Sequence, residues 1–343
     1  MSRNAKIGIA VVAVLALAVG AFALVGGKDG VIDALPGGDP PTCPLSGVEP
    51  RDDAALERPA VAVKVENAPV AYPLSGLEDA EVVYEELVEG GVTRFMAIYG
   101  CTDSGKVGPV RSARAIDPAI MTPATRILGF SGANNTVLEA LDEAGIVQIE
   151  ESEAGEAMQR VPREGLASEH TLYANTARLR RIGAKRFDDA PPDDLYEFGD
   201  LDGDAKRARS VTIEFSDVTS VSYEFRGGQW RRFQAGQPFV DESGKQIAVD
   251  NVVVEEHVVN ESDIVDVTGT PSVEIADVTG SGRAVLFRDG RAVVGRWVRE
   301  DVDGAVRFET KSGDAMVLAP GSTWIHLVPN DEGDVKGSFA YER

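Results

Sequence analysis

The stretch that decides the fold is EVVYEELVEGGVTRFMAIYG (81–100), in which two alternating apolar segments flank a glycine pair. Gly90 and Gly91 between the segments indicate the tight turn of a β-hairpin. Side chains alternate along a strand, so each arm is expected to group residues on one face: Val83, Glu85, Leu87 and Glu89 on the first arm, and Val92, Arg94, Met96 and Ile98 on the second.

Segments on either side of this hairpin predict further strands and helices. RPAVAVKVE (58–66) and RILGFSGA (126–133) are apolar and indicate buried strands. NNTVLEALDEAG (134–145) has an Asn cap, one apolar face and a terminal glycine, which together predict a helix. ANTARLRRIGAKRF (174–187) predicts another helix, with a basic face. Alternating strands and helices indicate an α/β domain with a mixed sheet at 58–187.

The second half of the chain has the pattern of an antiparallel β protein. An acidic, proline-bearing linker is expected at 188–209, followed by a β-meander domain at 210–330 and a tail at 331–343. Asp289-Gly290, Asp303-Gly304 and Ser312-Gly313 each separate two alternating segments, as in successive hairpins. The predicted class is therefore α+β: an N-terminal membrane anchor, an α/β domain and a C-terminal antiparallel β-rich domain.

The N-terminus predicts a membrane segment. Arg3 and Lys6 precede an uncharged, apolar run at 7–25, which is about long enough to cross a bilayer. Residues 1–25 are interpreted as a signal anchor that leaves the body outside the cytoplasm, or as a signal peptide cleaved near Ala23 and followed by secretion. Residues 26–57 are expected to be an extended linker. Outside the cytoplasm, Cys43 and Cys101 are expected to form a disulfide, the alternative being two free thiols.

Composition limits the function. The chain has 34 Lys and Arg residues against 56 Asp and Glu, a formal net charge of -22, which argues against nucleic-acid binding. No metal-binding spacing of His and Cys and no dinucleotide or phosphate-loop motif is present in the sequence, so no metal and no cofactor is predicted.

Arginines cluster in this acidic chain around Gly-Gly and Gly-Pro sequences, and guanidinium groups match carboxylate and phosphate oxygens. Internal salt bridges are the alternative explanation for each of them. Glu85 with His170 is a second hypothesis, an acid–base pair. The candidate ligand-binding residues are Glu85, Glu89, Arg94, Arg111, Ser112, Arg114, Arg163, His170 and Tyr173.

These motifs carry a resemblance to a known family. RPAVAVKVEN (58–67), VEGGVTRF (88–95), KVGPVRSAR (106–114) and SEHTLYANT (168–176) resemble the YerB-like family of bacterial lipoproteins, whose function is uncharacterised. The resemblance implies a two-domain extracytoplasmic protein and no established reaction. The chain lacks the lipid-accepting cysteine of the lipoprotein members, and it has Tyr72-Pro73-Leu74 where the family tends to have Arg-Pro-Gln.

Three functions remain open from the sequence. The first is a membrane-tethered module that binds an anionic envelope ligand, such as a phosphate-bearing wall polymer or peptidoglycan. The second is an envelope-acting hydrolase or transferase that uses Glu85 and His170. The third is a structural or protein-interaction role. Whether the protein is an enzyme is left open.

Overall fold

The computed structural model describes residues 40–201, 205–265 and 269–343. The predicted membrane segment at 7–25 and the cleavage position near Ala23 lie outside these residues. No helix within the described part of the chain is long and apolar enough to cross a bilayer. Residues 41–343 form one compact unit, and the description below concerns this unit.

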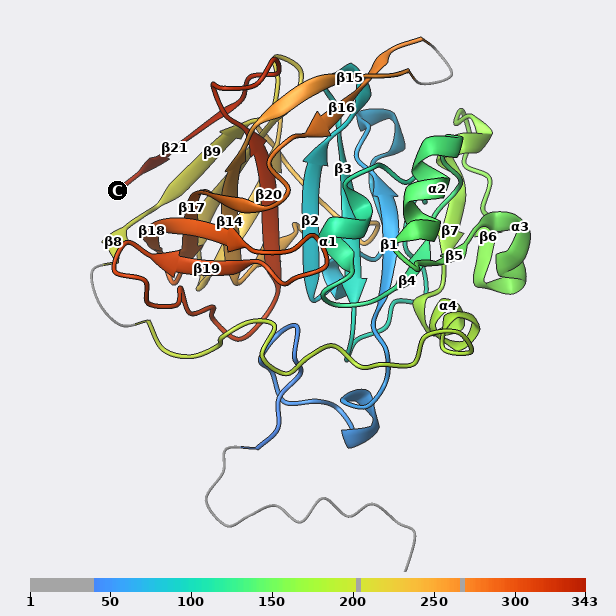
Figure 1. Ribbon diagram of the computed structural model, residues 1–343, viewed down its shortest axis with the longest axis horizontal. Coiled ribbons are helices and arrows are strands. Elements are labelled where there is room, and N and C mark those ends of the chain that lie inside the picture. The colour runs from blue at the N-terminus through green and yellow to red at the C-terminus, as the bar shows by residue number, and fades with distance from the viewer. Residues whose placement is uncertain (1–39, 202–204, 266–268) are drawn as a thin grey trace, which may run out of the picture. The chain divides into compact units, whose positions relative to one another are not determined.

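A single large mixed sheet runs through both halves of the sequence (Figure 1). Its strands, in spatial order, are β19 (Arg307–Thr310), β18 (Arg291–Arg299), β17 (Gly280–Arg288), β14 (Asn251–His257), β20 (Thr323–Pro329), β2 (Val82–Leu87), β3 (Thr93–Tyr99), β1 (Val61–Glu66), β4 (Ile127–Gly129) and β5 (Val147–Ile149), with β8 (Lys206–Arg207) beside β18. Strand β20 pairs in parallel with both β14 and β2. The two halves therefore share a sheet. The C-terminal half was predicted to be antiparallel, but it contains the parallel pair β14–β20.

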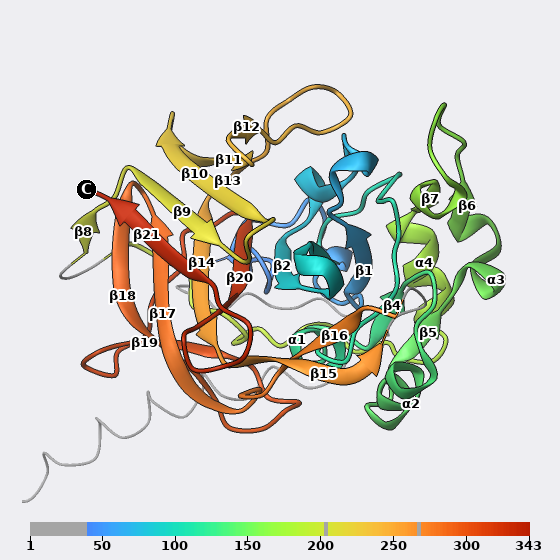
Figure 2. The same cartoon turned by 90° about the horizontal axis from the view of Figure 1, so that it is seen from above.

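A second, antiparallel sheet packs against one face of the first. It comprises β12 (Gln237–Pro238), β11 (Gln229–Gln234), β10 (Ser220–Arg226), β9 (Ser210–Glu214) and β21 (Ser338–Glu342), with β13 (Ala248–Val249) paired to β11. Figure 2 shows β21 alongside β9. The prediction of a C-terminal tail at 331–343 is therefore wrong, because Phe339 and Tyr341 alternate as strand residues and pack against the core.

Short helices and two small hairpins complete the unit. The helices are α1 (Asp117–Met121), α2 (Asn135–Glu143), α3 (Glu151–Ala154) and α4 (Thr176–Gly183), with 3-10 turns η1 (Asp53–Ala55), η2 (Pro69–Ala71), η3 (Leu77–Asp79), η4 (Glu89–Gly91), η5 (Gly155–Ala157) and η6 (Ser168–His170). The hairpins are β6 (Met158–Arg160) with β7 (Leu172–Ala174), and β15 (Val259–Val265) with β16 (Pro271–Ile275). The predicted Asn134 cap of α2 is present, since its side chain accepts a hydrogen bond from the Val137 N–H.

The core lies on both faces of the large sheet. On one face Val63, Phe95 and Trp324 join the second sheet and α4. On the other, Met96 and Ile98 pack with apolar residues of α1 and α2. A sheet covered on both faces explains why β1, β2 and β20 are buried along their whole length.

The segment before β1 is also folded, which corrects the prediction of an extended linker as far as residue 57. Cys43, Leu45 and Ser46 are buried. Cys43 and Cys101, the predicted pair, are joined by a disulfide bond with a Cα–Cα distance of 5.9 Å. Gly321 donates its N–H to the Ser46 carbonyl. The strap at 41–48 is thus attached to the end of β3 and to the loop before β20.

Candidate functional site

Strand register brings the first charged residues together. Strand β3 lies between β2 and β1, and Arg94 is the direct cross-strand neighbour of Glu86 on one side and Glu66 on the other. Side chains paired across a sheet lie on the same face. Glu86, Arg94 and Glu66 therefore occupy the face that α1 covers, at the end of the strands near the hairpin tip.

On this face Glu86 belongs to a buried layer of one cation and two carboxylates. Lys64, Glu86 and Asp117 are at most 1% exposed. The Lys64 ammonium donates to Asp117 Oδ1 at 2.6 Å and to Glu86 Oε1. Asp117 Oδ2 accepts the Arg114 N–H at 2.8 Å. Burial raises the pKa of Glu86 in spite of the attraction of Lys64, and Glu86 Oε2 has no hydrogen-bond partner among the described residues.

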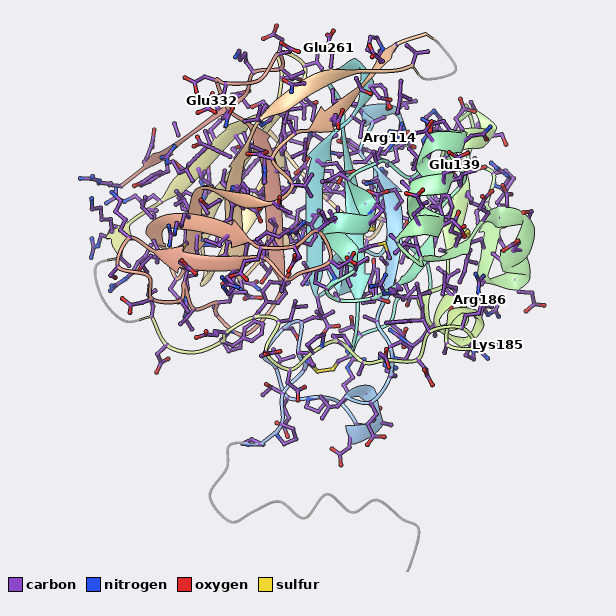
Figure 3. All side chains as sticks on the ribbon, viewed as in Figure 1. Arg114, Glu139, Lys185, Arg186, Glu261 and Glu332 are labelled. Atoms are coloured by element: carbon purple, nitrogen blue, oxygen red, sulfur yellow. A yellow bond between two sulfur atoms is a disulfide. The ribbon has the colours of Figure 1, made fainter. Side chains whose placement is uncertain are left out.

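An outer layer of arginines covers this buried group. Arg114, labelled in Figure 3, donates to Glu89 Oε2 through Nε at 3.1 Å and through Nη2. Arg94 is less well neutralised, because its Nη1 lies 3.8 Å from that same oxygen of Glu89 and 3.5 Å from the Ser112 carbonyl. Burial and the neighbouring Arg114 lower the pKa of Arg94 to about 10. Arg94 and Arg114 thus share one carboxylate.

The remaining members of the outer layer meet at Glu66. The His170 Nδ1 lies 2.8 Å from Glu66 Oε2, and Arg111 Nε lies 3.5 Å from Glu66 Oε1. Arg111 also donates from Nη1 to the Glu169 carbonyl at 3.2 Å. His170 and Arg111 therefore share a second carboxylate.

The outer layer carries a positive surplus that solvent can reach. Three guanidinium groups face two carboxylates in this layer even when His170 is neutral, and among the described residues the extra positive charge is opposed only by the buried layer, where Lys64 faces both Glu86 and Asp117. The arginine side chains remain partly accessible, with exposed fractions of 11% for Arg94, 23% for Arg111 and 16% for Arg114. An anion with two or more oxygens is the kind of ligand that such a group of partly satisfied guanidiniums can accept.

Glu85 does not belong to this group, and its predicted pairing with His170 is wrong. It lies on the opposite face of β2, fully buried, where Arg232 donates to both of its oxygens at 2.8 and 3.1 Å. His326 Nδ1 is 3.0 Å from Glu85 Oε2. Burial would raise the pKa of Glu85, but Arg232 and His326 together outweigh burial and lower it to about 2. A fully buried, permanently ionised carboxylate of this kind holds the two sheets together rather than transferring protons to a ligand.

Two other candidates hold a loop instead of facing a ligand. Arg163 donates to the carbonyls of Ala71 at 2.7 Å and Tyr72 at 2.9 Å, and to the Tyr173 hydroxyl at 3.2 Å. Tyr173 is buried, with the Lys106 ammonium 4.3 Å from its ring centre. Both residues therefore fix the 71–73 loop against β7.

The glycine pair has a different role from the expected approach to a ligand. The Gly91 carbonyl accepts hydrogen bonds from the hydroxyls of Ser216 at 2.6 Å and Thr219 at 2.7 Å. Ser272 donates to Glu89 at 2.6 Å. The hairpin tip at 88–92 is consequently held by the β9–β10 loop and by β16, both from the C-terminal half.

Six of the nine predicted site residues meet in the cluster, and four of its members were missed. Those brought together are Glu89, Arg94, Arg111, Ser112, Arg114 and His170, with Ser112 contributing its carbonyl. The missed residues are Lys64, Glu66, Glu86 and Asp117. A lysine within the apolar strand at 58–66 was the available signal, because a buried ammonium requires carboxylate partners.

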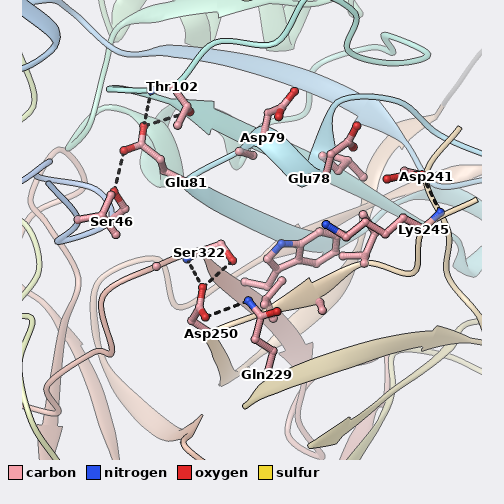
Figure 4. Close-up of a pocket in the computed structure, with 18 of the residues that line it drawn as sticks. Ser46, Glu78, Asp79, Glu81, Thr102, Gln229, Asp241, Lys245, Asp250 and Ser322 are labelled. Carbon is pink, nitrogen blue, oxygen red and sulfur yellow. Dashed lines mark hydrogen bonds between the residues drawn. The ribbon is translucent and has the colours of Figure 1, made fainter. Parts of the chain in front are cut away.

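A separate hollow of about 360 Å³ lies at the opposite end of β2 (Figure 4). Its carboxylates, with Arg51 and Lys245 as counter-charges, are Glu78, Asp79, Glu81, Asp241 and Asp250. Three of them bond internally: Glu81 accepts from Ser46 Oγ, the Gly100 N–H and Thr102, Asp250 accepts from Ser322 and Gln229, and Asp241 accepts from Ser243 and the Lys245 N–H.

Comparisons with known proteins match most of the chain. Residues 45–189 match the N-terminal domain, and residues 211–325 the C-terminal domain, of the protein of unknown function DUF3048. "Putative lipoprotein YerB" of Bacillus subtilis is 28% identical over 298 residues, which cover 84% of this chain and 86% of that protein. The crystal structure of Bacillus subtilis YerB matches with a TM-score of 0.72 and 25% identity, covering 87% of this chain and 99% of that one. The chain is therefore similar to YerB and belongs to the DUF3048 family, a two-domain family of unknown function.

Proposed function

We propose that this protein is an extracytoplasmic, membrane-associated module that binds an anionic ligand of the cell envelope through Arg94, Arg111 and Arg114. The location is supported by the lipoprotein description of the Bacillus relative and by the Cys43–Cys101 disulfide, since disulfides persist mainly in oxidising compartments. The predicted N-terminal span, or a cleaved signal peptide, would supply the route to that location.

The observation that carries the proposal is the positive surplus of the outer layer. The body of the protein is acidic, so its long-range field repels anions. A local group in which Arg94 shares Glu89 with Arg114, and Arg111 shares Glu66 with His170, offsets this repulsion at short range. Phosphate diesters of wall polymers and carboxylates of peptidoglycan share the required chemistry, which is two anionic or polar oxygens for a guanidinium fork.

The experiment compares binding of the full-length chain to purified wall material before and after the phosphate-bearing polymers are removed. Arg111→Ala is expected to weaken binding about 10- to 100-fold, because one charge-assisted contact contributes ~1.5–3 kcal/mol, and added salt is expected to weaken it further. Arg181→Ala is the matched control, since within the described ranges this exposed arginine donates only to a carbonyl of its own helix.

The outcomes separate the two ligand sources. Loss of binding after polymer removal identifies the phosphate groups, and retained binding identifies peptidoglycan. Binding that is absent, or that Arg111→Ala and Arg181→Ala change equally, contradicts the proposal.

A further inference from the structure

The buried layer contains a carboxylate, Glu86, that has no role in the proposed ligand binding. Lys64 is the cation in direct contact with two buried carboxylates, Glu86 and Asp117. Asp117 also accepts a hydrogen bond from the backbone N–H of Arg114. Glu86 bonds through Oε1, while its buried Oε2 has no hydrogen-bond partner among the described residues. Of the two carboxylates, Glu86 is thus the one whose negative charge is less fully compensated.

What remains to balance Glu86 is the guanidinium of Arg94. Arg94 is its direct cross-strand neighbour, and no carboxylate in the described structure lies within 3.8 Å of Arg94 except Glu89, which Arg114 already occupies. A ligand anion that draws on Arg94 adds a second negative charge beside Glu86. Buried like charges at short range are strongly unfavourable, and a proton on one of them removes the repulsion.

We infer that anion binding at the outer arginine layer is coupled to the uptake of one proton by Glu86, an inference that rests on the proposed function. The balance is simple: the protein, one ligand anion and one proton combine, and the proton resides on the Glu86 carboxyl. No bond in the ligand is made or broken. The raised pKa of Glu86 supports this step, because burial already brings the carboxyl close to protonation near neutral pH.

The test must distinguish proton uptake by Glu86 from proton uptake by the other charged groups around it. Those packed against it are Lys64 on β1, Arg94 on β3 and Asp117 on α1, while its neighbour on β20 is the apolar Leu327. The surrounding outer layer adds Glu66, Glu89, Arg111, Arg114 and His170. His170 is the main competitor, because an imidazole that took up the proton in place of Glu86 would add positive charge and favour anion binding in the same direction.

The test is calorimetric titration of the full-length chain with sulfate, an anion whose own charge is constant between pH 6 and 8. Each titration is run in two buffers of different ionisation enthalpy, so that the number of protons taken up is measured directly. We expect uptake approaching one proton, and sulfate affinity that falls up to tenfold for each unit that pH rises above the Glu86 pKa.

Two variants assign the proton. Glu86→Gln mimics the protonated carboxyl and is expected to bind sulfate at all pH values with the low-pH affinity of the wild type and without proton uptake. His170→Gln is expected to keep the uptake, whatever its affinity. Circular dichroism establishes that each variant is folded.

Each result decides the question. Sulfate binding by the wild-type protein without proton uptake overturns the coupling and leaves the proposed function standing. Uptake that persists in Glu86→Gln, or disappears in His170→Gln, assigns the proton to another group and also overturns it. Absence of sulfate binding at every pH counts against the proposed function itself. If Glu86→Gln does not fold, uptake by the wild type that survives His170→Gln still supports the inference, and its loss refutes it.

Discussion

Glu85 offers the sharpest test of how the two sheets are held together. Its carboxylate is fully buried and paired with Arg232, which reaches it from the second sheet. Glu85→Gln keeps the shape of the side chain but removes its charge, and so leaves the Arg232 guanidinium buried without a counter-ion. We expect a large loss of stability. The contacts within the arginine cluster, which lies on the opposite face of the sheet, need not change.

Two independent estimates of the loss agree. The pKa of Glu85 is about 2 in the folded protein instead of 4.5, and at about 1.4 kcal/mol per pKa unit the difference corresponds to roughly 3 kcal/mol of stability. Removing one partner of a buried ion pair costs about 3–5 kcal/mol in other proteins. The expected loss for Glu85→Gln is therefore about 3–4 kcal/mol at pH 7.

The sign of the pH dependence provides a second measurement. A carboxylate whose folded pKa is lowered stabilises the protein above its unfolded pKa, and the contribution disappears as pH falls from 4.5 towards 2. The difference between wild type and Glu85→Gln in urea unfolding should therefore shrink over that range. Glu139→Gln, which changes an exposed helix residue, is the control. If Glu85→Gln unfolds within 1 kcal/mol (about the effect of a surface substitution) of the wild type and of Glu139→Gln, the reasoning is refuted.

Three further predictions concern stability. Gly91→Ala should lower the free energy of unfolding by about 1–3 kcal/mol, more than Gly90→Ala does, although the two glycines have nearly the same φ (73° and 71°). The reason is that a Cβ added at Gly91 would lie 2.8 Å from the β9–β10 loop, whereas a Cβ added at Gly90 would have no described atom within 4 Å. Equal chemical-unfolding midpoints for the two variants would contradict this contact. Burial lowers the pKa of His257, but two flanking carboxylates raise it to about 8. The protonated imidazole should therefore stabilise the fold by roughly 2 kcal/mol below pH 6.5, and this stabilisation should be lost as pH rises through 8. His257→Gln should flatten that part of the curve of stability against pH, and an unchanged slope would exclude the effect. Cys101→Ser should cost about 4 kcal/mol by the entropy of the loop it opens, and thermal unfolding indistinguishable from that of the oxidised protein would disprove a stabilising disulfide.

Local structure was largely predictable from the sequence, because it depends on neighbouring residues. The hairpin at 81–100 and the Asn134-capped helix follow from alternation and capping preferences. Turn dipeptides such as Asp289-Gly290 also formed the expected hairpin, with both residues at positive φ.

Register was not predictable, and it decides the site. A two-residue turn at Gly90-Gly91 would place Arg94 opposite Leu87, whereas the actual five-residue loop at 88–92 places it opposite Glu86. A shift of one residue moves every side chain to the other face of the sheet. This is why Glu86 joins the arginine cluster and Glu85 turns towards Arg232.

Long-range partners were equally invisible to pattern analysis. Arg232 lies 147 residues after Glu85, and Ser272 lies 183 residues after Glu89. No local periodicity links residues so far apart. Their pairing depends on how strands of the C-terminal half pack against strands of the N-terminal half.

The place of β20 between β14 and β2 has a consequence for biosynthesis. The N-terminal half has the outer edge of β2 unpaired, and that edge stays open until residues 323–329 have reached the compartment in which the chain folds. Unpaired edges recruit other strands, and such non-local pairings close slowly. Nascent chains halted before residue 323 should accordingly be the species that chaperones capture and that aggregate when chaperones are scarce.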